Sequence, residues 1–395
     1  MTSNESGIPP EPATRVSLGT IAREWTRLGC IGFGGPPTHI ALLRRMCVEQ
    51  RQWIDAQEFE AAIATTSMLP GPASTQLAIF CAWRLRGPVG AILGGACFII
   101  PGLVVILALS AVFLASHPPD AVLGAAAGAG AAVPAVALHA ASQLVPASWK
   151  RIGTGRSQRL RWIAYAVVGG FAAATIGPYL VLVLLACGVA EIVVRLPGRP
   201  MRGSTRAVLP AAVLPTATAS GLGAVAWVAL KVGALSYGGG FVIIPLMQHD
   251  VVTTYHWMSG AQFLNAVALG QITPGPVVQT VAAVGYAAAG VGGGLLAAVI
   301  AFAPSFLFVL TGGPHFDKIR ANNTVESFLT GAGPAVLGAI AGSAIPLGLS
   351  LQHLWQIPVL AGALLWLFVI RRGVVSGLLL ASGCGILAAL AGVPV

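Results

Sequence analysis

The tripeptide Pro-Gly-Pro occurs twice in the chain, at residues 70–72 and 274–276. Proline ends a preceding helix and suits the first position of the next one, and glycine permits the bend between them. A helix that begins at such a break presents unpaired backbone N–H groups at the positive end of its dipole, where an anion can bind. Two such ends favour a tetrahedral oxyanion over a cation as the ligand, although either tripeptide alone also fits a tight turn.

Hydroxyl and amide side chains surround both tripeptides and add hydrogen-bond donors. Ser67 precedes the first tripeptide and Thr280 follows the second. Because the donors recur around both, a binding site explains the pattern better than a turn. The predicted substrate-binding residues of the two breaks are Pro70, Gly71, Pro72, Ser74, Thr75, Gln76, Thr273, Pro274, Gly275, Pro276 and Gln279.

A glycine-rich segment precedes each break, and its backbone N–H groups could turn toward a ligand. Close packing of helices explains any one of these glycines equally well. The glycines that we include in the predicted site are Gly34, Gly35, Gly238, Gly239 and Gly240.

Arg27 and Lys231 occupy equivalent positions just before these glycines. An ionisable group inside a membrane segment is a candidate for function, so both cations are included in the predicted substrate site, where they would balance the charge of an anion. The alternative is that their long side chains extend to the lipid interface.

Titratable side chains near these elements are candidates for proton coupling, since histidine titrates near neutral pH. Asp55 and Glu58 are better explained as helix caps. The pattern does not choose among the remaining candidates, which are His39, Glu49, Glu60 and Asp250.

Motifs for a metal, a cofactor or catalysis are not visible in the sequence. The six cysteines are scattered without a C-x-x-C spacing, and no Walker A sequence or paired haem histidines are present. We therefore expect no catalytic residue, no metal and no cofactor, and a protein that is not an enzyme.

The elements that hold the candidate residues are expected to lie in a lipid bilayer. Of the 395 residues, 56% are hydrophobic and only 9% are charged, whereas soluble domains carry about 25% charged residues. Apolar runs long enough to span lipid recur along the chain. The basic residues that give the net charge of +10 lie in short loops between these runs, as in membrane proteins, so we expect no nucleic-acid partner.

The chain contains two diverged copies of one unit. Equivalent residues lie 204 positions apart, as do Pro70 and Pro274, and Trp53 and Trp257. A gapless match of rare residues over this length indicates a duplication rather than chance.

The charges of the loops indicate that the two copies cross the membrane in opposite directions. In the first copy the loops near Arg84 and at 150–161 are basic, whereas 116–120 has no Lys or Arg. In the second copy the pattern is reversed, and the loop with Lys318 and Arg320 is the basic one. Because cytoplasmic loops collect Lys and Arg, this predicts an inverted repeat.

The helices that flank each break are predicted to be shorter than a membrane span. Capping-box patterns at Asp55 and Ser259 predict helices that begin at Ala56 and Gly260. Each would run for about 14 residues, or about 21 Å, against a hydrocarbon core of roughly 30 Å. The next helix is expected to begin at the last proline of each tripeptide. We expect these half-helices to meet near the membrane centre.

The expected fold class is an all-α polytopic membrane protein with two inverted-topology repeats and broken half-helices. The expected division is a disordered tail at 1–15, a first repeat at 16–161, a linking helical hairpin at 162–206, a second repeat at 207–352 and a C-terminal helical hairpin at 353–395.

The same motifs resemble those of the chromate ion transporter family in its long, two-domain form. The resemblance rests on residues 33–40, Trp53 and residues 69–72 in the first copy, and on 237–239 and 273–276 in the second. It covers nearly the whole chain. The second copy departs from the pattern, so a proton-handling histidine shared by both copies is not expected.

This resemblance implies a secondary transporter that moves chromate outward across the bacterial plasma membrane and confers chromate resistance. The membrane potential or a proton gradient would drive it. Sulfate has nearly the size, shape and charge of chromate, so it is the alternative substrate, and a homodimer is left open. The residues alone also leave open a transporter for an amino-acid carboxylate, whereas a membrane-embedded chromate reductase would need a redox site that the sequence does not show.

Overall fold

The computed structural model describes most of the chain, and its regular structure there is helical. The predicted tail at 1–15 lies outside the described residues, as do Pro70, Gly238, Gly239 and Gly240 of the predicted site. The described residues are 16–67, 69, 71–115, 118–152, 155–175, 180–195, 221–236, 243–312 and 322–394.

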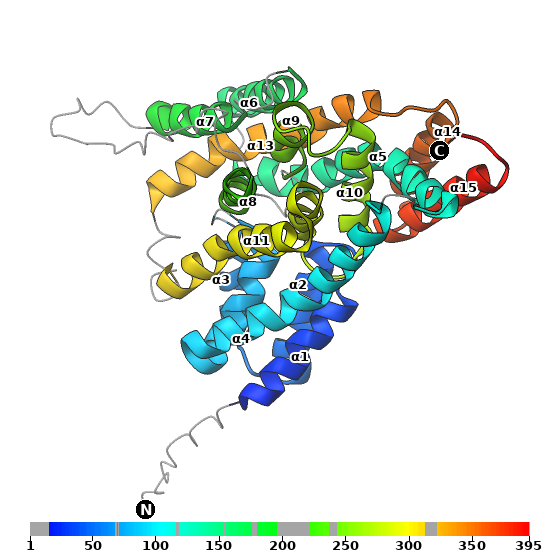
Figure 1. Cartoon of the computed structure of the whole chain (residues 1–395). Helices are drawn as coiled ribbons and strands as arrows, with labels where there is room; N and C mark the ends of the chain where they lie inside the picture. The colour runs from blue at the N-terminus through cyan, green and yellow to red at the C-terminus, as the bar shows by residue number, and fades with distance from the viewer. Residues whose placement is uncertain are drawn as a thin grey trace, which may run out of the picture.

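The two copies contain their α-helices in the same order (Figure 1), and the second copy has two additional short turns, η4 (Val277–Gln279) and η6 (Leu365–Val369). The first copy consists of α1 (Leu18–Ile31), α2 (Pro36–Arg44), the π-helical turn η1 (Arg45–Gln50), α3 (Ala56–Thr66), α4 (Ala73–Phe113), α5 (Asp120–Arg151), α6 (Arg156–Thr175) and α7 (Leu180–Arg195). The second consists of α8 (Leu222–Leu235), α9 (Ile243–His249), η3 (Asp250–Thr254), α10 (Gly260–Ile272), η4 (Val277–Gln279), α11 (Thr280–Gly312), α13 (Asn323–Leu349), α14 (Gln356–Leu364), η6 (Leu365–Val369) and α15 (Val374–Leu390).

Four helices in the described parts of the chain are long and apolar enough to cross a membrane. They are Ala73–Phe113, Asp120–Lys150, Val277–Gly312 and Asn323–Leu349. Large apolar side chains such as Val104 and Val299 are more than half exposed on two of them, as expected for surfaces that face lipid. The protein is an all-α polytopic membrane protein, which confirms the expected fold class. The opposed orientation of the copies rests on the loop charges and stays a prediction.

Helices α4 and α11 each fold back on themselves. Non-helical backbone angles interrupt α4 at Arg86–Gly87 and α11 at Ala289–Gly290. Gly94 packs directly against Ala82, although a straight helix would hold these residues about 18 Å apart. Each helix is therefore a hairpin with one short arm and one arm long enough to span the membrane.

The half-helices begin largely as predicted. Asp55 Oδ1 caps α3 by accepting from the Gln57 N–H at 2.7 Å. Ser259 and Gln262 form the complete capping box of α10, with bonds of 2.9 and 3.2 Å. In the first copy the box is incomplete, because the Glu58 side chain pairs with Arg84 instead.

The prediction that helices begin at Pro72 and Pro276 is corrected by one residue. Both prolines have extended backbone angles and act as N-cap residues, so the helical turns begin at Ala73 and Val277. Proline fixes φ near a value that suits a cap as well as a helix, and ψ, which the sequence does not fix, decides between them.

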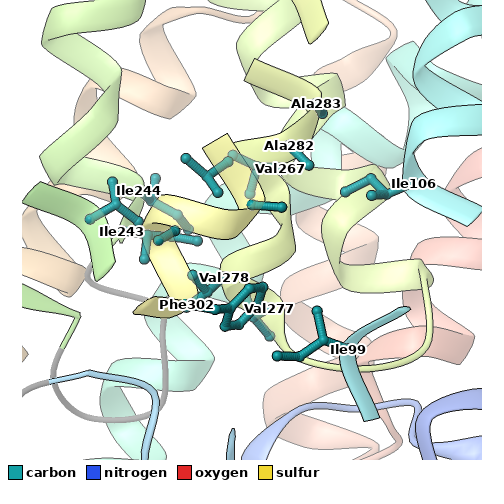
Figure 2. Close-up of a cluster of buried hydrophobic side chains, with 14 of the residues drawn as sticks. Ile99, Ile106, Ile243, Ile244, Val267, Val277, Val278, Ala282, Ala283 and Phe302 are labelled. Atoms are coloured by element: carbon teal, nitrogen blue, oxygen red, sulfur yellow. The ribbon is translucent and has the colours of Figure 1, made fainter. Parts of the chain in front are cut away.

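The two copies pack against each other through equivalent helices, α4 against α11 and α5 against α13. Contact between equivalent elements is the pattern of a two-fold relation. Figure 2 shows the apolar core at this interface, where Ile99 of α4 lies beside Val277 of the second copy. This interface is the centre of the molecule.

The last two helices of each copy pack against the other copy. Helices α6 and α7 lie along α13, whereas α14 and α15 pack on α5 (Figure 1). Glycines allow the close approach, as Gly338 lies on the backbone of Ala166 and Gly128 on that of Ala381. The predicted domain boundaries stay a prediction, but this exchange means that neither copy completes its packing alone.

Candidate functional site

Both Pro-Gly-Pro breaks lie at the interface between the copies. Gly71 has φ +112° and Gly275 has φ +94°, backbone conformations that glycine adopts readily. A Cβ added to Gly71 would lie 3.3 Å from Ser305 Oγ of α11. In the same way, Gly102 of α4 packs against the carbonyl of Pro274. Each break therefore contacts the long arm of the other copy, as the predicted meeting of the two breaks requires.

The helix that follows the first break begins with backbone N–H groups that have no acceptor within the helix. The N–H groups of Thr75 and Gln76 bond to Pro72 O at 2.9 and 3.0 Å, which starts the helical pattern. The N–H groups of Ala73 and Ser74 come before that point and have no acceptor within the helix. The second break is similar, because the Gln279 N–H bonds to Pro276 O at 2.9 Å.

A chain of hydrogen bonds joins the two breaks through His39. The Gly32 carbonyl at the end of α1 accepts from the Gly275 N–H at 2.9 Å and from His39 Nε2 at 2.9 Å. His39 Nδ1 lies 3.2 Å from Ser74 Oγ in the first turn of α4. Because a carbonyl only accepts, the neutral ring carries its proton on Nε2, and Nδ1 accepts from the Ser74 hydroxyl. His39 is 1% exposed, and its ring packs edge-on against Phe98.

Several buried polar side-chain atoms around the breaks have no hydrogen-bond partner among the described residues. Leaving one such group unpaired costs about 1–3 kcal/mol, so a cluster of them points to a bound ligand. These atoms are Thr75 Oγ1, Ser236 Oγ, Gln271 Nε2, Gln279 Oε1 and Ser305 Oγ.

Sequence reasoning missed Ser236, Gln271 and Ser305. Ser305 follows Pro304 in an apolar span, where Gly102 follows Pro101 at an offset of 203 positions, one less than before the break. The proline recurs in both copies, and the serine that follows it in the second copy could have been recognised as a candidate from the sequence. Ser236 matches Gly32 at the offset of 204, but nothing local marks it as part of a site.

The predicted cations do not lie with the buried break residues. Arg27 is exposed on α1. Lys231 is mostly buried, with its side chain 10% exposed, but it forms an ion pair with Asp250, so each neutralises the other. Glu49 and Glu60 are more than half exposed and both pair with Arg44. Of the four proton-coupling candidates, His39 is the one whose hydrogen bonds reach a break among the described residues.

A cavity of about 1000 Å³ leads to the first break. Its lining includes Gly34, Ser67 and Gly71 and segments of α5, α13 and α15. Those segments are 139–148, 329–337 and 373–379, and in the sequence the first precedes Lys150 and the last follows Arg371 and Arg372. The described lining includes hydroxyl and amide groups but no charged side chain.

A second cavity of about 430 Å³ lies beside α10. Its lining includes residues near 114–118 and 350–356, which have no Lys or Arg. Ala127 and Gly130 in this cavity match Thr330 and Gly333 in the larger one at the offset of 203. Equivalent helix faces of the two copies thus line cavities whose surrounding loops differ in charge.

Metal binding has no visible basis in the described residues, where no group of three His, Cys, Asp or Glu side chains could hold an ion. The cysteines described there are free thiols. The chemistry that the site offers is hydrogen-bond donation from helix ends and neutral side chains.

Comparison with known proteins places this architecture in a family. The sequence model of the chromate transporter family matches twice, at residues 19–192 and 223–392, so the second match begins 204 positions after the first. A chromate transport protein of Cupriavidus metallidurans is 33% identical over 343 residues, which cover 85% of this chain and 84% of that protein.

Other relatives extend the comparison. A probable chromate transport protein of Synechococcus elongatus is 31% identical, with 89% of this chain and 90% of that protein covered. A chromate transport protein of Pseudomonas aeruginosa is 28% identical, with 87% and 86% covered. No solved structure matches the chain. The chain therefore belongs to the chromate transporter family.

Proposed function

We propose that the protein is a secondary active transporter that exports chromate across the bacterial plasma membrane. The observation that carries this proposal is the pair of Pro-Gly-Pro breaks at the interface of the copies, joined through Gly32 and His39 and surrounded by unpartnered hydroxyl groups. The curated relatives supply the name of the anion. We propose no catalytic step, since binding and movement of the anion account for the site.

Neutral donors are sufficient to bind a tetrahedral dianion at this place. The N–H groups of Ala73 and Ser74 lie at the positive end of α4, and the hydroxyls of Thr75 and Ser305 are close to the same break. Oriented N–H and O–H groups at a helix end favour negative charge. Gln279 has a different role, because its Nε2 donates to Ile99 O at 2.7 Å and fixes the second break against α4.

The proposed orientation puts the larger cavity on the cytoplasmic side. Two of its lining segments adjoin Lys150 and Arg371 in the sequence, and such basic loops are retained in the cytoplasm. The structure then represents an inward-open state, and the inverted repeat allows the copies to exchange conformations for the outward-open state. The smaller cavity would enlarge on the other side.

The membrane potential can drive export of a dianion. Moving one charge through 100 mV changes its free energy by about 2.3 kcal/mol. The free energy of a dianion therefore falls by roughly twice that amount when it leaves a negative interior. Export at this driving force would keep the cytoplasmic concentration low and confer resistance to chromate.

Sulfate or another small oxyanion is the second candidate substrate. The donors at the breaks recognise shape and charge, and sulfate closely matches chromate in both. The proposal also includes a homodimer in the lipid bilayer. The oligomeric state of the purified protein tests it.

Radiolabelled chromate flux into inverted membrane vesicles tests the proposed function. We expect uptake that sulfate reduces by competition and that collapses when the membrane potential is removed. Vesicles without the protein are the control. Chromate flux equal to that control would reject the proposal, whereas sulfate flux without chromate flux would establish the second candidate.

A further inference from the structure

We propose that His39 takes up a proton when an anion binds at the two breaks, so that the proton and the anion move together. This inference rests on the proposed function. It adds that His39 is the residue that takes up the proton, and that proton uptake and anion binding favour each other. It starts from the position of His39, which is bonded on one side to Ser74 at the first break and on the other to Gly32, the acceptor of the second break.

The charges around His39 link its protonation to anion binding. Ser74 lies in the first turn of α4, and Gly32 O is bonded to the Gly275 N–H at the second break. Both breaks are followed by the positive ends of helical segments, so an imidazolium between them is disfavoured while no anion is bound. A dianion at the breaks reverses the sign of the local charge and favours the added proton.

The Ser74 hydroxyl transmits the change. In the neutral state its proton is donated to His39 Nδ1 at 3.2 Å. When a proton from solution binds Nδ1, the ring becomes a donor on both nitrogens, and Ser74 Oγ must accept. The Ser74 O–H is then released from the ring and becomes a further donor for the anion. No covalent bond other than the new N–H forms or breaks.

Other charged groups around His39 do not account for such coupling. Elements α1, η1 and α4 pack around α2, and the charged side chains on these elements are either paired or exposed. The pairs are Glu24 with Arg51, Glu58 with Arg84, Glu49 and Glu60 with Arg44, and Arg86 with Val16 O. The exposed residues are Arg23, Arg27 and Arg45. The cysteines on these elements, which are free thiols, are Cys30, Cys47, Cys81 and Cys97, and none of them is a described hydrogen-bond partner of the His39 ring. The described hydrogen bonds of the ring go only to Ser74 and Gly32.

The coupling has a definite sign. Binding free energies are reciprocal, so an anion that favours the proton is itself bound more tightly as pH falls. A proton that leaves with the dianion reduces the exported charge from two to one. An inward proton gradient would then oppose export, and the membrane potential would have to drive it.

Proton uptake during anion binding tests this inference. Purified full-length protein in lipid nanodiscs is titrated with chromate in buffers of different ionisation enthalpy, and the slope of the heats gives the protons taken up per anion. We expect the wild type to take up more protons than His39→Gln, approaching one extra proton per anion. The chromate dianion itself gains a proton near neutral pH, and this contribution is equal in both proteins.

A matched control is His256→Asn, because His256 is an exposed histidine whose described hydrogen bond goes to Val252 O at 3.0 Å and not to a break. Its φ of +53° is one that asparagine tolerates. It should behave as the wild type. Equal proton uptake by wild type and His39→Gln would overturn the inference while leaving chromate binding intact. Absence of chromate binding in every protein would instead reject the proposed function, and this inference with it.

A second measurement needs no variant, in case His39→Gln does not fold. Wild-type affinity for chromate, corrected for the titration of the anion itself, is measured between about pH 6 and about pH 8, the range in which histidine titrates. We expect the corrected affinity to rise toward low pH by up to about tenfold per pH unit. A flat corrected affinity would overturn the inference.

Discussion

At the scale of single residues, the site depends on side chains that are buried without partners. Ser305 and Thr75 are fully buried, yet their hydroxyl oxygens have no hydrogen-bond partner among the described residues. A residue kept for stability would be expected to have its polar atom paired. The proposed anion would supply the partners that these hydroxyls lack among the described residues.

Replacement of Ser305 by alanine should separate binding from stability. A hydrogen bond to a charged group contributes about 1.5–3 kcal/mol, so we expect Ser305→Ala to weaken anion affinity by about tenfold or more. The melting temperature should stay equal or rise, because an unpaired buried hydroxyl is removed.

The matched control is Ser110→Ala, since Ser110 is equally buried but its hydroxyl donates to Ile106 O at 2.7 Å. Its transport should be normal. Unchanged affinity in Ser305→Ala, measured by chromate titration and thermal unfolding, would remove Ser305 from the site.

At the scale of elements, the broken helices need glycine at one position. Gly71 has φ +112°, and a side chain there would meet Gln76 and Ser305. Backbone strain of this kind costs about 1–3 kcal/mol in a residue with a Cβ. The helix end and the hydroxyls around it would be displaced together.

We expect Gly71→Leu to abolish chromate transport while the protein still reaches the membrane. The same should hold for Gly275→Leu, because Gly275 has φ +94°. Gly362→Leu is the control, since Gly362 is exposed on α14 with no neighbour within 4 Å of an added Cβ. Vesicle flux measures chromate transport, and immunoblots of the membrane fraction measure how much protein reaches the membrane. Normal flux in Gly71→Leu would show that the break does not form the site.

At the scale of the whole molecule, the two copies form one unit. The long arms cross at the central interface, and the terminal helices of each copy pack on the other, with Gln356 Nε2 donating to Ala127 O at 3.2 Å between them. Cavities lie beside equivalent faces of α5 and α13. An opposed orientation of the copies would place these cavities on opposite sides of the membrane.

Reporter fusions test the opposed orientation directly. A reporter fused after Pro118 should be active only outside the cytoplasm, and one fused after Lys318 only inside it, because the second loop is basic and the first is not. Paired alkaline phosphatase and fluorescent protein fusions measure this. The same side for both positions would mean that the copies are parallel.

Much of the fold could be predicted because it follows local rules. Apolar length predicted the spans, the Asp55 and Ser259 patterns predicted the starts of α3 and α10, and the offset of 204 predicted the repeated order of elements. Each of these signals depends on residues close together or on direct comparison of two segments. The family resemblance rests on the same residues and was confirmed by the comparisons.

The sequence by itself determined that this is a duplicated membrane protein with two broken helices, and it predicted a preference for anions. The tertiary structure alone decided that His39 bridges the breaks, that Asp250 neutralises Lys231 and that Ser305 faces Gly71. The physical reason is that hydrogen bonds and ion pairs across a helix interface depend on rotation and register of helices distant in sequence. Composition and spacing fix how a helix begins and ends, but only packing fixes which side chain faces which.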